Sequence, residues 1–182
     1  MPFTPFHLGP AICLAIPLRR YIHAPTFILA SLVLDIEPLL VLIFGLNYPL
    51  HGYFHTLIAA IGVGFVFGLA MFCLESIMHP LYRTLLLVPE TPFSRRQFLL
   101  AAVLGTILHV LFDSPLYSDI KPFFPSTLNP LYGLAYSLEI YILCILMGIL
   151  GIIFYFLLIL SKQHWKTRGK SLITEDLHSH SR

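Results

Sequence analysis

Charged side chains are scarce in this sequence: Asp, Glu, Lys and Arg together make up 11% of its 182 residues. Soluble domains carry about 25%, so the chain lacks the charged surface that a soluble domain of its size needs. The net charge of +2 is small, and there is neither a nucleic-acid-binding motif nor a basic stripe with interleaved aromatics, so we expect no nucleic-acid partner. Hydrophobic residues make up 57%, which predicts a chain covered by a lipid bilayer.

Cysteine is also scarce, and the three residues Cys13, Cys73 and Cys144 lie far apart, each inside an apolar run. No C-x-x-C pair is present, so neither a zinc–thiolate site nor a redox motif is supported. We expect these side chains to pack as small apolar residues. The N-terminus lacks the basic region of a cleavable signal peptide, so we expect the first apolar segment to stay in the mature protein.

Five apolar stretches dominate the chain, and a membrane-spanning helix needs about 17–25 such residues. They are residues 6–18, 26–46, 53–74, 98–117 and 134–160. The first is short for a complete span, whereas the other four are long enough. The sequence therefore predicts an all-α fold, a polytopic membrane helical bundle of four to five transmembrane helices over residues 1–161. We expect the basic segment 162–182 to be a flexible tail.

Two longer connections between the apolar stretches, and the glycines of the third stretch, allow more specific predictions. Residues 75–97 contain three prolines, so we expect a loop with a short interfacial helix. Residues 114–133 contain four prolines and several aromatics, a composition typical of the membrane–water interface. Gly62, Gly64 and Gly68 form a small-residue face suited to close helix packing.

The basic residues predict the orientation of the chain. If all five stretches cross the membrane, ten of the eleven Lys and Arg residues fall on one side, and Lys121 alone falls on the other. Because Lys and Arg accumulate in cytoplasmic loops, we expect a multi-pass protein of the cell (inner) membrane with an outside N-terminus and a cytoplasmic tail. If the first stretch enters only partway, the N-terminus lies inside and the other helices keep their orientation.

Ionisable side chains interrupt the apolar stretches in a pattern. Each costs about 2.5–3.5 kcal/mol at the centre of a spanning helix, so each needs a partner, a cavity or a metal. His51 and His55 form H-x-x-x-H at the start of the third stretch, and His109 and Asp113 form H-x-x-x-D near the end of the fourth. Residues at i and i+4 share one face of a helix, so each pair can present two ligands to one point.

Topology brings these pairs to the same side of the membrane. His7 begins the first stretch on the outer side. Asp35 lies deeper, about 16 Å below the outer end of the second stretch if that helix is straight. Both pairs also lie at outer helix ends, so we expect side chains far apart in sequence to meet in the outer half of the bilayer.

Four imidazoles and two carboxylates are suitable ligands for zinc, manganese or iron, and the set is large enough for one or two ions. We favour zinc. A bound divalent ion lowers the pKa of its water to about 7 and polarises a phosphoryl or carbonyl oxygen. Glu37 or a spare histidine could then be the general base, whereas a carboxylate beside a metal-bound histidine could instead fix its tautomer. The expected metal ligands are His7, Asp35, His51, His55, His109 and Asp113.

Each motif also has a simpler interpretation. The H-x-x-x-H pair can cap a helix start, the H-x-x-x-D pair can be one interhelical hydrogen bond, and Asp35 can belong to a proton relay. Some enzyme classes are not supported: there is no H-E-x-x-H of a zincin-type protease and no G-x-S-x-G of a serine hydrolase. Val103 stands where the lipid-phosphatase superfamily needs an arginine.

Four elements occur in a characteristic order: His7, then Leu34-Asp35-Ile36-Glu37-Pro38, then His51-x-x-x-His55-Thr56, then His109-x-x-x-Asp113-Ser114 before the proline-rich segment. This order resembles the YdjM-like inner-membrane proteins, a family described as metal-dependent hydrolases. The resemblance covers roughly residues 1–135 and implies that the six expected ligands are metal-site positions. Three positions depart from the family pattern and alter the expected substrate contacts, namely Leu34 for proline, Glu37 for aspartate and Gly52 for arginine.

The main functional hypothesis is a membrane-embedded metal-dependent hydrolase that acts on an amphiphilic substrate, such as a phospholipid or an isoprenoid phosphate ester. An ion- or proton-handling transporter is one alternative, although transporters usually show internal repeats and polar residues along both halves of the path. A structural membrane subunit, in which the polar groups satisfy one another, is the other.

Overall fold

The computed structural model describes residues 5–89 and 92–179, with side chains between residues 6 and 162 of these ranges. Within this part of the chain every regular element is helical, which confirms the predicted all-α fold. The elements are, in order, α1 (Pro5–Leu18), α2 (Ala24–Val33), α3 (Ile36–Phe44), the 3₁₀ turn η1 (Tyr53–His55), α4 (Leu57–Thr84), α5 (Arg95–Asp113) and α6 (Ser137–Ser179).

Four helical segments are long and apolar enough to cross a membrane: Ala24–Phe44, which joins α2 and α3, then α4, α5, and Ser137–Lys162 of α6. Helix α1 has 14 residues and is therefore about 21 Å long, shorter than the hydrocarbon layer of about 30 Å. Large apolar side chains cover the outside of the bundle; Val66, Ile77 and Ile152, for example, are 67%, 73% and 67% exposed. Such a surface suits lipid.

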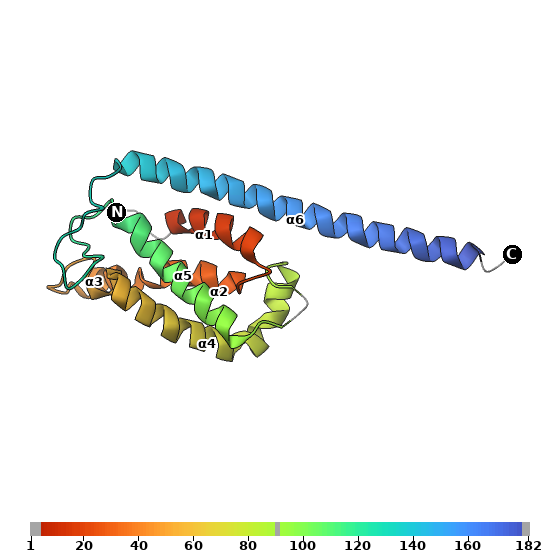
Figure 1. Cartoon of the computed structure of the whole chain (residues 1–182), viewed down its shortest axis with the longest axis horizontal. Helices are drawn as coiled ribbons and strands as arrows, with labels where there is room; N and C mark the ends of the chain where they lie inside the picture. The colour runs from red at the N-terminus through yellow and green to blue at the C-terminus, as the bar shows by residue number, and fades with distance from the viewer. Residues whose placement is uncertain (1–4, 90–91, 180–182) are drawn as a thin grey trace.

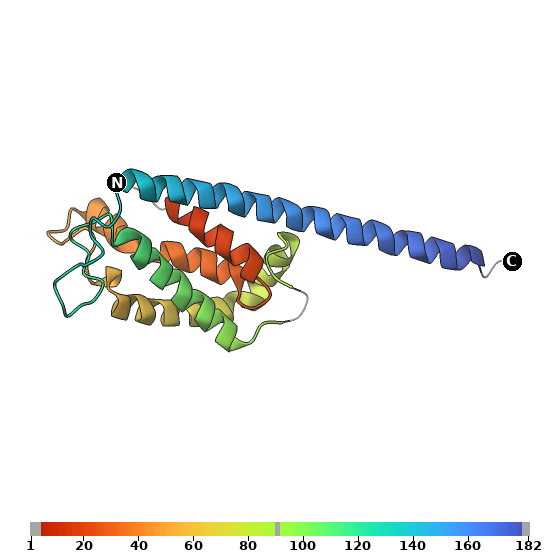
Figure 2. The same ribbon diagram turned by 45° about the horizontal axis from the view of Figure 1, so that its top comes forward.

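The helices form one bundle with a long outer helix (Figures 1 and 2). Helix α5 packs on α4 and α2, and α1 packs on α2 and α6. Helix α6 continues well past the other helices (Figure 1). Its side chains beyond Lys162 lie outside the described residues, so the expected flexibility of the 162–182 tail stays a prediction.

Glycines allow close approach at two of these interfaces. A Cβ atom on Gly9 of α1 would lie 2.1 Å from the carbonyl oxygen of Cys144 in α6, and a Cβ on Gly64 of α4 would lie 2.6 Å from Oγ1 of Thr106 in α5. Gly68 meets α5 in the same way. Gly62 was predicted to share this face, but it has nothing within 4 Å of its Cβ position, so that part of the prediction was wrong.

A tightened turn separates α2 from α3 at Leu34 and Asp35. Pro38 has no N–H and so cannot donate to the carbonyl of Leu34, four residues earlier. That carbonyl instead accepts the N–H of Glu37 at 3.0 Å, a 3₁₀-type bond. As a result, Asp35 and Glu37 lie at a break in the helix rather than within a regular turn.

Helix α4 begins later and ends later than the sequence predicted. Thr56 caps it by accepting the N–H of Ala59 at 3.2 Å, so the helix starts after both histidines of the H-x-x-x-H motif. The prediction that His51 and His55 share one face of a helix was therefore wrong. The loop expected over 75–97 was also wrong in its first half, because α4 continues through Pro80 to Thr84.

The two ends of the bundle differ in composition. At one end the α3–α4 and α5–α6 connections lie side by side (Figures 1 and 2), and the N–H of Leu57 donates to the carbonyl of Pro122 at 2.9 Å; we call this the loop end. At the other end α1 and α4 end and α5 begins. We call this the basic end. It carries Arg19, Arg20, Arg83, Arg95, Arg96 and Lys162.

Candidate metal centre

The six side chains predicted as metal ligands come together near the loop end, in two groups that share Asp113. Within each group, one ligand atom per residue lies within 4.8 Å of every other. The structure therefore brings together all six positions from five separate segments, and these buried groups could hold a metal ion. The groups are His7, Asp35, His109 and Asp113, and His51, His55 and Asp113.

Each segment is placed by local structure. His7 lies in the first turn of α1, and Asp35 lies at the tightened turn between α2 and α3. His51 lies in the loop before α4, and His55 ends the η1 turn. In α5 the i,i+4 spacing worked as predicted, because Nε2 of His109 lies 3.3 Å from Oδ2 of Asp113.

The rings of His55 and His109 face each other at the centre. Nδ1 of His55 donates to Oε2 of Glu37 at 2.9 Å, and Nδ1 of His109 donates to the carbonyl of Ser31 at 2.7 Å. Both partners can only accept, so each ring carries its proton on Nδ1 and presents a lone pair at Nε2. These two Nε2 atoms lie 3.3 Å apart. Two facing lone pairs repel unless a cation lies between or beside them.

His51 is held in the same manner by an aspartate that the sequence analysis did not select. Nδ1 of His51 lies 3.1 Å from Oδ1 of Asp119, and the backbone N–H of His51 donates to Oδ2 of Asp119 at 3.1 Å. Its other ring nitrogen is then available on the side of His55, with the two ring centroids 4.9 Å apart. A histidine that binds metal usually donates its second N–H to a carboxylate or a carbonyl, and all three of these histidines do so.

Asp113 connects the two groups. Its Oδ1 lies 3.1 Å from Nε2 of His7, and its Oδ2 lies 4.0 Å from Nε2 of His55. Despite the short distance to His7, Oδ1 has no aligned hydrogen-bond donor among the described residues, and the same is true of Oδ2 of Asp35. Buried carboxylate oxygens without donors are costly, and a cation is the partner that this arrangement lacks.

His7 closes the centre on the α1 side. Its ring stacks on the ring of His109 with centroids 4.0 Å apart and planes 27° apart. Oδ1 of Asp35 lies 3.7 Å from Nε2 of His109 on another side. Imidazoles and carboxylates thus surround the same point from α1, the α2–α3 turn and α5.

Glu37, the predicted general base, has both carboxylate oxygens occupied. Oε1 accepts from the Tyr48 hydroxyl and from the N–H of Phe54, both at 3.3 Å. Oε2 accepts from the N–H of Gly52 at 3.1 Å as well as from His55. These bonds hold the α3–α4 connection and the His55 ring in place together.

Burial and hydrogen bonding set the charge state of the centre. His55 is fully buried, and this burial lowers the pKa of its imidazole, an effect that the hydrogen bond to Glu37 opposes. The ring is therefore neutral at neutral pH, which is the form that binds metal. The neighbouring carboxylates of Asp35 and Asp113 supply negative charge that a divalent cation would balance.

A pocket of about 310 Å³ opens beside the centre at the loop end. His51 lies in its wall and also belongs to the second ligand group, so the pocket adjoins that group at His51. Among its described lining residues Lys121 is basic and Asp119 is acidic, and Tyr48, Tyr53 and Phe124 are aromatic. Its lining residues are Tyr48, Pro49, His51, Gly52, Tyr53, Thr56, Asp119, Lys121 and Phe124.

Sequence reasoning missed three of these participants. Asp119 and Lys121 lie in the proline-rich α5–α6 connection, where no helical periodicity relates them to the histidines. Ser31 contributes its backbone carbonyl, which no side-chain pattern can reveal.

No family model, curated protein or solved structure matches this chain.

Proposed function

We propose that this protein is a membrane-embedded metal-dependent hydrolase that acts on a phosphate ester of an amphiphilic substrate, such as a phospholipid or an isoprenoid phosphate. The observation that carries the proposal is the pair of Nε2 atoms of His55 and His109, 3.3 Å apart, with both Nδ1 protons given to acceptors. Membership of the YdjM-like family, which the motif order favours, is part of the same proposal.

The donor set favours zinc, because neutral imidazoles and carboxylates are its usual oxygen and nitrogen ligands. When bound, such an ion supplies an activated water and polarises a phosphoryl oxygen. Two ligand groups that share Asp113 would allow the centre to hold one or two ions. Manganese or iron would fit the same ligands.

The adjoining pocket supports a phosphate-bearing, partly apolar substrate. Lys121 offers a positive charge for a phosphate, and a lysine ammonium binds phosphate as a compact point charge. Tyr53 and Phe124 offer ring surfaces for apolar chain next to it, with ring centroids 5.6 Å apart. If the basic end faces the cytoplasm, as the positive-inside rule predicts, this pocket opens toward the outer headgroup layer.

The contacts of the acidic residues assign their roles. Because Glu37 already accepts four hydrogen bonds, we assign it to holding His55 rather than to removing a proton from water. His51 belongs to the second ligand group, and Asp119 holds its Nδ1 in the same way. In this proposal Glu37 is therefore a positioning residue and His51 is a metal ligand.

A proton could bridge the His55 and His109 nitrogens in place of a metal, and the 3.3 Å separation is compatible with such a bond. This observation supports the second candidate, a proton-handling membrane protein. The two proposals differ in one measurable property, the metal content.

The test uses the full chain purified in a mild detergent. We expect elemental analysis to find at least one divalent ion per chain in the wild type, none in His109→Ala, and the wild-type amount in His79→Ala. His79 is a matched control because it lies in α4 near the basic end and pairs with Glu75 at 2.8 Å. The wild type and His79→Ala should release phosphate from phosphatidic acid or a polyprenyl phosphate, and His109→Ala should not. A wild-type protein without stoichiometric metal would rule the hydrolase proposal out.

A further inference from the structure

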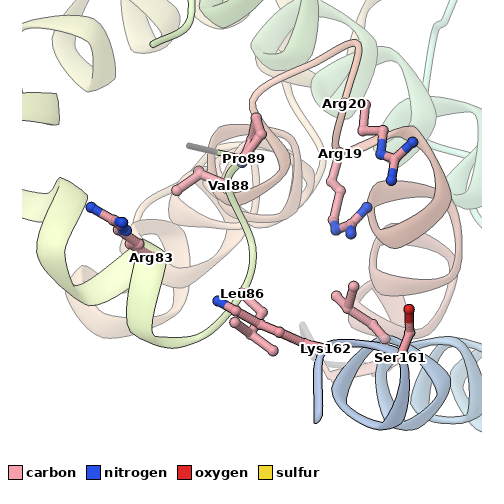
Figure 3. A pocket seen from close by; sticks show the side chains of 9 residues that line it. Arg19, Arg20, Arg83, Leu86, Val88, Pro89, Ser161 and Lys162 are labelled. Atoms are coloured by element: carbon pink, nitrogen blue, oxygen red, sulfur yellow. The ribbon is translucent and has the colours of Figure 1, made fainter. Parts of the chain in front are cut away.

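A second pocket lies at the basic end, with a volume of about 460 Å³ (Figure 3). It lies between the end of α1, the loop after α4, and the middle of α6. Figure 3 shows Arg19 reaching into the space between α1 and α6, and Lys162 extending from α6 toward the loop. The lining residues are Arg19, Arg20, Arg83, Leu86, Val88, Pro89, Leu158, Ser161 and Lys162.

This basic pocket is separate from the metal centre. Arg19 follows the end of α1 while His7 lies near its start, twelve residues earlier in the sequence, or about 18 Å along a helix. Likewise, the α4 end of the pocket wall lies a full 28-residue helix away from Thr56. A ligand in the basic pocket would therefore not touch the groups that hold a metal.

Three basic side chains of the pocket, Arg19, Arg20 and Lys162, are placed to bind an anion together. Arg19 and Arg20 are adjacent in sequence, Lys162 comes from another helix, and no acidic residue is present among the described residues of the lining. Arg19 is half-buried, and this burial together with the charge of Arg20 lowers the pKa of its guanidinium. Like charges gathered in a partly desolvated cavity repel one another, so an anion that binds there gains from all of them.

Apolar side chains of the pocket lining follow an unusual end of α4. The N–H of Leu87 donates to the carbonyl of Tyr82 and the N–H of Leu86 to that of Arg83, both at 3.0 Å, which is the Schellman pattern. Leu86 occupies the left-handed position of this motif at φ 60°, where glycine is usual. A leucine there costs about 1 kcal/mol or more, and it places an apolar side chain in the pocket wall.

The lining combines basic side chains with leucine, valine and proline side chains, and this combination suits an amphipathic ligand. We propose that the basic pocket binds the phosphate headgroup of an anionic lipid, with Arg19, Arg20 and Lys162 around the phosphate and Leu86, Val88 and Leu158 against its glycerol and upper acyl segments. Basic pockets between transmembrane helices are known to accept such headgroups on the cytoplasmic side. The site would thus take a lipid from the leaflet opposite the one that the metal centre faces.

The experiment measures thermal unfolding of the purified full chain in a neutral detergent while lipid is added. Phosphatidylglycerol supplies the anionic headgroup, phosphatidylcholine is the zwitterionic comparison, and inorganic phosphate tests a soluble source of the same chemistry. The variant Arg19→Gln/Arg20→Gln removes two pocket charges. Its matched control, Arg95→Gln/Arg96→Gln, removes two exposed charges at the same end of the bundle but outside the pocket.

We expect phosphatidylglycerol to raise the unfolding midpoint of the wild type and of Arg95→Gln/Arg96→Gln, and phosphatidylcholine to raise neither. The Arg19→Gln/Arg20→Gln variant should need roughly 25-fold more phosphatidylglycerol for the same shift, about fivefold for each charge. If that double variant does not fold, Lys162→Gln at the exposed rim should need about fivefold more.

Two results would overturn the proposal. Equal lipid dependence in the pocket variant and the control would mean that only general surface charge attracts the lipid. A full shift with inorganic phosphate alone would mean that the pocket serves a soluble anion. Running the series again in His109→Ala separates this site from the metal centre, because a lipid that bound there as substrate would lose its effect.

Discussion

Glu37 accepts the Nδ1 proton of His55 at 2.9 Å, across 18 residues of sequence and from a different helix. The same carboxylate accepts the backbone N–H groups of Gly52 and Phe54. It therefore fixes the tautomer of the His55 ring and the path of the chain that carries the ring.

Replacing Glu37 by Gln tests this role. Removing such a partner of a metal-binding histidine weakens metal affinity by about 10–100-fold, because the amide is a weaker acceptor and no longer favours the Nδ1–H tautomer so strongly. We expect that loss in a competition assay against a chromogenic chelator, with the helical content unchanged. The control is Glu139→Gln, since Glu139 lies at the start of α6 and accepts only the N–H of Tyr136 among the described contacts. Equal affinities in both variants would contradict the role of Glu37.

Lys121 should act on substrate rather than on metal. It lies in the pocket beside the centre but in neither ligand group. We therefore expect Lys121→Gln to raise KM for a phosphate-ester substrate about tenfold, as for the loss of one charge-assisted hydrogen bond, with metal content unchanged. Lys162→Gln, at the opposite end, should leave KM as it is. A fall in kcat with an unchanged KM would show that this lysine does not bind the phosphate of the ground-state substrate.

The sequence allowed the spans and all six candidate ligands to be predicted, and helix geometry explains the spans and one of the ligand pairs. A span is recognised by apolar length alone, and a fixed helical register places His109 and Asp113 on one face. The same argument failed for His51 and His55, because the residues before α4 do not form an α-helix. Their rings still approach each other through hydrogen bonds of Glu37 and Asp119, which sequence spacing does not encode.

The polar cluster at the basic end was missed altogether. His23 lies just before α2, Glu75 in the middle of α4, and the two approach to 3.2 Å between Nε2 and Oε2. Sequence analysis placed Glu75 at the start of a loop, because Pro80 and Pro89 outweighed the apolar residues between them. In the structure Tyr82 and Val88 pack against Phe98, and this tertiary contact keeps α4 helical through Pro80.

Two glycines of α4 give a matched test of helix packing. Gly62→Ala should raise stability by about 0.5–1 kcal/mol, because alanine favours a helix and the Cβ meets nothing within 4 Å. Gly64→Ala should lower it by about 1–3 kcal/mol, since its Cβ would lie 2.6 Å from Thr106 Oγ1 and 2.9 Å from Val103 Cα. Denaturant unfolding in mixed micelles measures both. Effects of the same sign would show that α4 and α5 do not pack as closely as the structure has them.

His23 predicts a pH dependence of stability. Its Nδ1 accepts the N–H of Thr26 at 3.3 Å and so caps α2, which protonation of that nitrogen would prevent. Burial, and to a lesser degree the charge of His79, lowers the pKa of His23 to about 3 from the usual 6.5. Between pH 6.5 and 3, His23 is therefore protonated in the unfolded chain but not in the folded protein. The contribution of His23 to the free energy of unfolding is fully present above pH 6.5. It falls by about 1.4 kcal/mol per pH unit as the pH drops from 6.5 toward 3.

The variant that isolates this effect is His23→Asn, because asparagine keeps a side-chain acceptor at the N-cap and does not titrate. Its absolute stability should be lower, since the ring that stacks on Phe98 at 4.0 Å is lost. Between pH 6.5 and 4.5, however, its stability should fall less steeply than that of the wild type. Both proteins are compared in chelator, so that protonation of the metal ligands contributes equally. Glu75 and His79 also face His23, and parallel pH curves for the two proteins would assign the dependence to those groups and not to His23.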